Sequence, residues 1–299
     1  MKKLIWALSA LAVASTACQQ SSPKTIVAAT NRAPAADTTQ QQAPGIRQPL
    51  PTLFAAADTL TPPMRALLQA HDLAPLWQNA DSSYRSTPVY EGFFGPDHYH
   101  FAMAFTQVKR DPANPAVYHV RGKSRYRKNI RPFSGTLTVR KLVDLSYPGF
   151  LQDMATDDSN AADSLSGRTY TAHAQVQLRE ERKENSGIFE GELLLDFYVV
   201  PAKKPGYVTV FDHEGLEEGL PTRGCGLLLR GNRLNVSTGQ VKSFTVAPWV
   251  SAVAVDVFKD FMLDERMGEI NPKYARLGWN EFWNNDEWWA DSPKPSLNL

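Results

Sequence analysis

The feature that most constrains this chain is a two-residue alternation of apolar and polar side chains. The first such run spans residues 98–108, and its apolar face carries Tyr99, Phe101, Met103 and Phe105. The alternation returns at residues 169–178 and again at 188–199. Because successive side chains of a strand point to opposite faces, these runs predict half-buried antiparallel strands.

The alternating runs belong to segments that repeat the order strand, polar turn, strand. Residues 118–139 and 174–195 both follow this order, and each has a glycine two positions after a mid-strand phenylalanine, Gly135 and Gly191. A looser third hairpin spans residues 224–249. Mid-strand glycines fit bends of a strongly coiled sheet. Consecutive hairpins form a meander, so we expect an all-β fold that closes into a barrel, lipocalin-like in general shape, or splits into a β-sandwich.

The first residues of the chain have the parts of a secretory signal. Two lysines precede the apolar run Leu4–Val13, and small residues lead to Cys18. This arrangement resembles a bacterial lipoprotein signal, in which the cysteine is acylated and becomes the first mature residue. The resemblance covers fewer than 20 residues and departs from the usual pattern at Ser15, where leucine is common. Ordinary cleavage after the small residues Ala12 and Ala14 is the alternative.

The composition divides the rest of the chain. We expect a signal peptide at 1–17, a lipidated Cys18 with a flexible tether over 18–59, and a single β-rich domain over 60–299. The tether is rich in Ser, Pro, Thr, Ala and Gln, whereas Thr61 and Pro62 predict the start of a short helix at about 62–72. An aromatic-rich segment ends the domain. These features predict an exported protein of the bacterial cell envelope, periplasmic or on the cell surface, anchored to a membrane by acyl chains on Cys18.

Two histidines in the first run raise the question of a metal. His98 and His100 have the spacing that places two ligands on one face of a strand, and His119 on the next expected strand is a third weak candidate. A cupin carries a glutamate four or five residues after the second histidine, where this chain has Ala104 and Phe105. We therefore expect no bound metal, and histidines that face water.

A second group of candidates is the basic hairpin, residues 121–131. Six cations crowd this segment: Arg121, Lys123, Arg125, Arg127, Lys128 and Arg131. Such a patch can hold phosphates of envelope lipids or an acidic polymer, although the tips of hairpins are also commonly charged because they are solvated. The formal net charge of only +1, together with export, argues against a nucleic-acid partner.

The third group is aromatic. Four tryptophans near the C-terminus lie among Asn, Asp and Glu, a combination typical of sugar binding: Trp279, Trp283, Trp288 and Trp289. However, Trp279, Phe282 and Trp283 also have the spacing of a short amphipathic helix, which would pack across one end of the barrel.

Signatures of catalysis are missing where they would be specific. The chain has no Gly-x-Ser-x-Gly motif, and the alternating carboxylates Glu190, Glu192 and Asp196 are typical of the wet face of a strand. We therefore assign no catalytic residue and expect no cofactor. The first hypothesis is a non-enzymatic lipoprotein that binds a small apolar or saccharide ligand. The second is a structural or assembly lipoprotein that binds another envelope protein, and the third is an enzyme acting on envelope polymers.

Overall fold

The computed structural model describes residues 59–78, 88–145, 169–199, 208–210, 221–264, 269–282 and 286–291. The chain divides into two units, Met1–Ile46 and Arg47–Leu299, and every described residue belongs to the second. The predicted signal peptide, Cys18 and nearly all of the predicted tether lie outside the described residues. Within the described ranges, no helix is long and apolar enough to cross a membrane.

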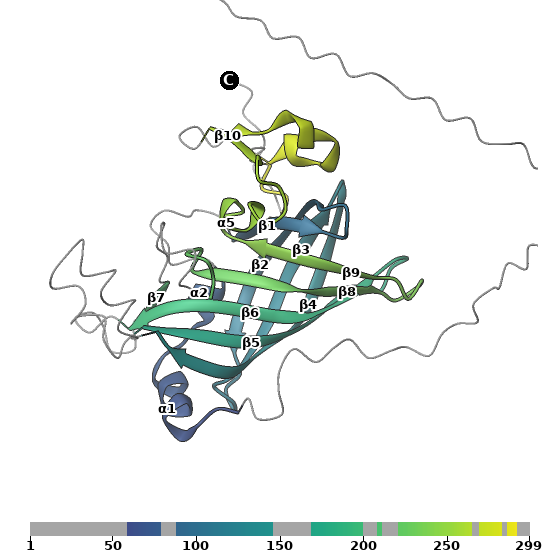
Figure 1. The fold of residues 1–299 in the computed structure, drawn as a ribbon. Helices are drawn as coiled ribbons and strands as arrows, with labels where there is room; N and C mark the ends of the chain where they lie inside the picture. The colour runs from purple at the N-terminus through teal and green to yellow at the C-terminus, as the bar shows by residue number, and fades with distance from the viewer. Residues whose placement is uncertain are drawn as a thin grey trace, which may run out of the picture. The chain divides into compact units, whose positions relative to one another are not determined.

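Eight antiparallel strands close on themselves as a barrel (Figure 1). They are β1 (Val89–Phe94), β2 (Tyr99–Arg110), β3 (Val117–Tyr126), β4 (Asn129–Asp144), β5 (Thr169–Glu180), β6 (Gly187–Val199), β8 (Leu227–Asn235) and β9 (Val241–Ala247). They pair in chain order, and β9 returns to pair with β1, so each has a partner on both sides. The short strand β7 (Val208–Val210) also pairs with β6. The predicted antiparallel meander is confirmed, as a barrel rather than a sandwich.

The interior of the barrel is filled by apolar side chains. All eight strands contribute to one continuous core, which includes the apolar faces predicted for β2, β5 and β6. Strands approach one another closely at two interior glycines. A Cβ added at Gly135 would lie 2.0 Å from the carbonyl oxygen of Gln177, and one added at Gly191 would lie 2.2 Å from that of Arg230. A side chain at either position would therefore collide with the backbone of the neighbouring strand.

Two N-terminal helices cover one end of the barrel, α1 (Pro62–Ala70) and α2 (Ala74–Trp77). The ring of Trp77 is fully buried and meets that of Tyr118 at 6.0 Å, edge to face. The hydroxyl of Tyr90 donates a hydrogen bond to the carbonyl of Trp77 at 2.5 Å. The short helix expected near residues 62–72 therefore belongs to a plug that closes this end.

The C-terminal segment packs on the outer wall of the barrel. It comprises α5 (Ser251–Ala254), β10 (Met262–Asp264), β11 (Glu269–Ile270) and the 3₁₀ helices η1 (Pro272–Leu277) and η2 (Trp279–Glu281). Its apolar side chains cluster with outward-facing residues of four strands, Phe93, Leu194, Leu228 and Ala247. We call this group the wall cluster. The single helix expected across one end of the barrel does not form, because Gly278, with φ of 89°, interrupts the helical turns.

Residues 286–291, which we call the strap, also lie against the outer wall. Trp288 is 6 % exposed and clusters with Val89, Ala102 and Ala104. The alanines lie on the outer face of β2, where their small side chains leave room for the indole ring. The outer face of β2 is therefore covered at Ala102 and Ala104, whereas Thr106 further along the same face is exposed.

Candidate functional site

The three histidines considered as metal ligands do not share a site. His98 lies in the β1–β2 turn with φ of 53°, before β2 begins. His100 is only 7 % exposed, contrary to the expectation of a wet face, and its Nε2 lies 2.6 Å from Oε2 of Glu91. His119 is on β3, with Nε2 2.8 Å from Oδ2 of Asp111. Among the described residues, no group of three or more His, Cys, Asp or Glu side chains is arranged to hold a metal ion.

The tryptophans named as sugar-binding candidates lie against the barrel wall. Trp279 is 1 % exposed and packs on Phe93, with 5.2 Å between ring centroids. Trp288 is buried as well, and half-buried Trp289 meets its ring edge-on at 5.9 Å. Trp283 lies outside the described residues. The indoles of Trp279 and Trp288 are covered by other side chains of the protein, which include the imidazole of His100 at 4.4 Å from Trp279 and the guanidinium of Arg125 at 5.0 Å from Trp288.

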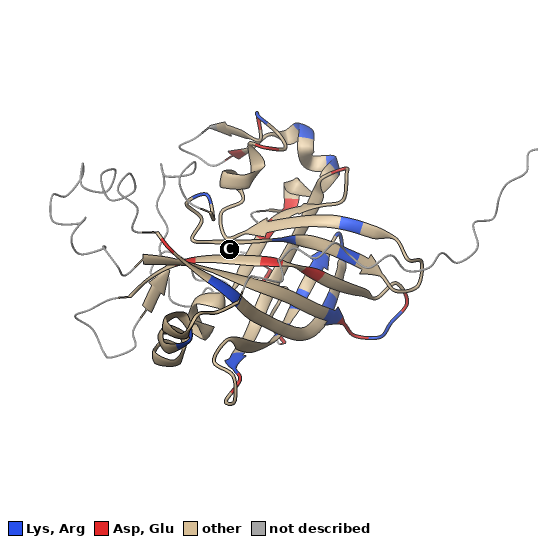
Figure 2. Cartoon of the chain, turned by 60° about the horizontal axis from the view of Figure 1, so that its bottom comes forward, with Lys and Arg blue, Asp and Glu red and all other residues tan. Residues whose placement is uncertain are grey.

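The basic hairpin separates into residues with different surroundings. Lys123 and Arg125 bind the strap: Nζ of Lys123 lies 3.0 Å from Oδ1 of Asp291, and Nη1 of Arg125 lies 2.8 Å from Oδ2 of Asp286. In the view of Figure 2, positions of cations and of carboxylates are interspersed along the strands. Two of the six charges are therefore already neutralised within the chain.

The other four cations of the hairpin divide between surface and barrel mouth. Arg121 and Lys128 are exposed, and Arg127 lies over the rings of Tyr99 and Tyr126, at 5.0 and 5.3 Å from their centroids. Arg131 instead lines a cavity at the mouth. The sequence-defined patch is thus not one continuous surface.

The mouth is the end of the barrel opposite α1 and α2. Residues at or beside the β1–β2, β3–β4, β5–β6 and β8–β9 turns surround a cavity of about 320 Å³ there. Phe94, Phe101 and Tyr126 form its aromatic side, and the rings of Phe94 and Phe101 stack at 5.0 Å. The ring of Phe189 lies 6.0 Å from that of Phe101 and belongs to the core below. A concave cavity with an aromatic side and polar groups above it is typical of small-molecule sites.

A buried ion pair organises the polar side of the mouth. Glu180 is 4 % exposed, and its Oε2 accepts hydrogen bonds from Nη2 of Arg233 at 2.6 Å and from the backbone N–H of Gly187 at 2.7 Å. Its Oε1 accepts a hydrogen bond from the hydroxyl of Ser124 at 3.1 Å. A carboxylate bonded on both oxygens is held in one position, so it fixes the guanidinium of Arg233 as well.

Two further cations at the mouth are not neutralised within the chain. Among the described residues, neither Arg131 nor Lys242 has a carboxylate partner, although both line the cavity. Nζ of Lys242 lies over the rings of Phe94 and Tyr126, at 5.6 and 6.0 Å from their centroids. The mouth therefore combines aromatic surface with positive charge.

Among these mouth residues, only Arg131 is a site residue predicted from the sequence, and it was predicted to belong to the basic hairpin. The sequence does contain a pattern that indicates their position. Glu180 lies two residues after Leu178, and Lys242 two residues before Phe244, so each shares the side of its strand that faces the barrel interior. A charged residue in phase with an apolar face points into the barrel.

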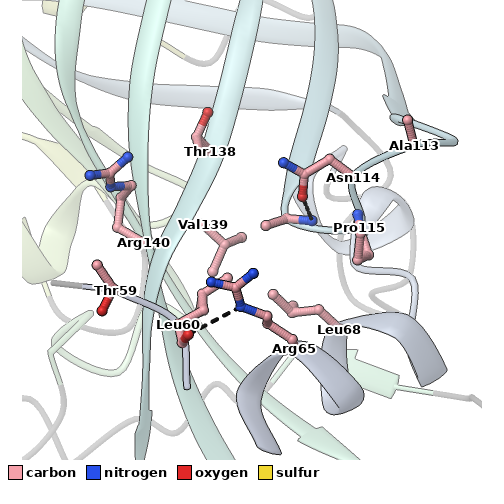
Figure 3. Close-up of a pocket in the computed structure, with 11 residues that line it drawn as sticks. Thr59, Leu60, Arg65, Leu68, Ala113, Asn114, Pro115, Thr138, Val139 and Arg140 are labelled. Atoms are coloured by element: carbon pink, nitrogen blue, oxygen red, sulfur yellow. Dashed lines mark hydrogen bonds between the residues drawn. The ribbon is translucent and has the colours of Figure 1, made fainter. Parts of the chain in front are cut away.

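A larger cavity of about 470 Å³ lies beside α1, at the plugged end (Figure 3). Its polar groups include two that bond within the chain: Nε of Arg65 donates to the carbonyl of Leu60 at 3.2 Å, and Oδ1 of Asn114 accepts from the N–H of Ala116 at 3.1 Å. None of the described residues that line it is aromatic. Of these two cavities the mouth is the better candidate, because it offers aromatic rings together with converging charges.

A buried carboxylate lies on the outer side of β6. Asp196 is fully buried and accepts hydrogen bonds from the hydroxyls of Thr171 and Thr222, each at 2.5 Å. Burial raises the pKa of Asp196 to about 6, although these hydrogen bonds oppose the rise. The expectation of a wet face on β6 fails at this residue, because the segment that contains Thr222 covers it.

Comparisons with protein-family models, curated proteins and solved structures find no match for this chain. The geometry of the chain's own residues is therefore the basis for assigning a function. Within the described ranges, that geometry is most specific at the barrel mouth.

Proposed function

We propose that this protein is a non-enzymatic, lipid-anchored protein of the bacterial cell envelope that binds a small ligand in the mouth of its barrel. The observation that carries the proposal is the cavity of about 320 Å³ with Phe94, Phe101 and Tyr126 on one side and polar side chains on the other. Its volume falls at the lower end of the range of small-ligand pockets, about 300–1,000 Å³. The aromatic side suits an apolar body or the apolar face of a sugar ring.

The alternative of an assembly protein has less support. A partner that adds a strand needs a free sheet edge, but each of the eight barrel strands is paired on both sides, and the edges left among the described strands are those of β7, β10 and β11, each at most 3 residues long. A partner that binds the basic hairpin would compete with the strap for Lys123 and Arg125.

Binding at the mouth can be tested with N-phenyl-1-naphthylamine, an uncharged apolar dye whose fluorescence rises when it leaves water. The full chain carrying Cys18→Ser avoids detergent, which would itself take up the dye. We expect saturable binding that Tyr126→Ala weakens about tenfold, because the ring forms part of the aromatic side. Tyr198→Ala, on the outer face of β6, is the matched control and should leave the dissociation constant unchanged. Absence of saturable binding, or equal effects of the two variants, would refute the proposal.

The anchor has its own test. Cys18→Ser should move the exported protein from the membrane fraction to the soluble fraction, because the acyl chains are lost. An unchanged membrane fraction would contradict lipid attachment at Cys18.

A further inference from the structure

We infer that the ligand is an amphipathic anion, with an apolar body against the aromatic side of the mouth and a carboxylate or phosphate group held by Lys242 and Arg131. The inference rests on the proposed function and names the chemical class of the ligand. It comes from the charges of the cavity, which the aromatic side alone does not explain.

The lining of the mouth is electrostatically unbalanced. It carries three cations, Arg131, Arg233 and Lys242, but only one carboxylate, Glu180. The formal charge of the described lining is therefore +2. A cavity wall of one sign concentrates ligands of the opposite sign, and the apolar side of this cavity lowers the local screening by water.

The single carboxylate of the lining already has hydrogen-bond partners within the chain. Glu180 is bonded by Arg233, by the backbone of Gly187 and by Ser124, which occupies both of its oxygens. Arg233 is also bonded within the chain, since its Nη2 donates to the carbonyl of Asn185 at 2.7 Å. This pair therefore forms a fixed wall, and the positive charge left for a ligand resides on Lys242 and Arg131.

These two cations enter the same cavity from opposite sides of the barrel, because β4 and β9 are four strands apart around the ring. Arg131 on β4 is the direct cross-strand neighbour of Ser124 on β3. The ammonium of Lys242 lies 6.0 Å from the ring centroid of Tyr126, two residues further along β3. Because both side chains line this one cavity, an anionic group held between them can pair with both, while an apolar body extends toward Phe94 and Phe101.

Both cations are partly withdrawn from water, which favours an anionic partner. Lys242 and Arg131 are half-buried, and the rings beneath Lys242 give it only a cation–π contact. A hydrogen bond between charged groups is stronger than that contact, and the carboxylate or phosphate of a ligand would supply it. Four amide side chains of the lining, Asn129, Asn185, Asn235 and Gln240, offer further polar contacts.

Two dyes with the same aromatic body separate charge from apolar contact. Anilinonaphthalene sulfonate carries one anionic group that N-phenyl-1-naphthylamine lacks. On the Cys18→Ser chain, we expect the anionic dye to bind about tenfold more tightly than the neutral one, and its affinity to fall as salt is added. Octanoate and octyl phosphate should displace it, and their relative strength distinguishes a carboxylate from a phosphate ligand, whereas inorganic phosphate should not displace it.

Variants assign the effect to particular residues. Lys242→Gln and Arg131→Gln should each weaken the anionic dye about five- to tenfold and change the affinity of the neutral dye less than about twofold. Lys141→Gln is the matched control, because Lys141 is an exposed lysine of β4 outside the mouth and its loss should change neither dye. Thermal melting of each variant verifies that the barrel is intact.

The outcomes separate this inference from the proposed function. Equal binding of the two dyes, with Lys242→Gln and Arg131→Gln both without effect, overturns the anion while the mouth remains a binding site. Displacement by inorganic phosphate as effective as by octyl phosphate overturns the amphipathic ligand. Binding of neither dye overturns both proposals.

Discussion

Replacing Asp196 with asparagine should change how the stability of the barrel depends on pH. The carboxyl is fully buried, and burial raises its pKa from 3.8 to about 6. Between these two values the folded state holds a proton that the unfolded state has released. The free energy of unfolding contributed by this group is therefore fully present below about pH 4 and is lost as the pH rises through about 6. A shift of about two pKa units corresponds to about 3 kcal/mol.

The measurement is a series of urea unfolding curves, followed by tryptophan fluorescence, at pH values from about 4 to about 8. The stability of the unmodified protein should fall across this range by about 3 kcal/mol relative to Asp196→Asn, which cannot titrate. Asp97→Asn removes an exposed carboxylate from the β1–β2 turn and is the matched control. Parallel stability curves for the unmodified protein and Asp196→Asn would refute the reasoning.

Two further predictions concern the ion pair at the mouth and the tryptophans of the strap. Arg233→Gln should cost about 3–5 kcal/mol in urea unfolding because it strips the cation from a carboxylate that is 4 % exposed. The double variant with Glu180→Gln should recover most of that loss, and an additive double variant would show that the pair is not coupled. Trp288→Ala should cost about 3 kcal/mol, since it empties the space over Ala102 and Ala104. Trp289→Ala should cost less because that ring is only half-buried, and thermal melts with equal losses would contradict this placement of the strap.

The sequence predicts the strands best where one face is buried and the other is not. The apolar faces of β2, β5 and β6 were assigned correctly because large and small or polar side chains alternate along them. β1 was missed, because the alternation disappears when both faces are covered. Five of its six residues are buried, since Tyr90 points into the core while Phe93 joins the wall cluster.

The candidate site was less predictable because it depends on how the barrel closes. Glu180 and Arg233 are far apart in the sequence and meet only because β6 lies between β5 and β8. In the same way, Lys123 and Arg125 form ion pairs with the strap, and no sequence pattern near the strap predicts that it packs against β3. The alternation of side chains determines the face of the strand on which a residue lies. Which residues of other strands lie next to it depends on the strand order and the register.

The wall cluster has a consequence for the order of folding. It combines side chains from β1 and β9, whose pairing has the longest sequence separation of any in the barrel. Pairings this distant form slowly, because a long loop must be closed first. The surface that receives Phe261 and Trp279 is therefore complete only once the ring of strands has closed. The C-terminal segment then docks late in folding, and it stabilises the pairing of β1 with β9 from the outer face of the barrel.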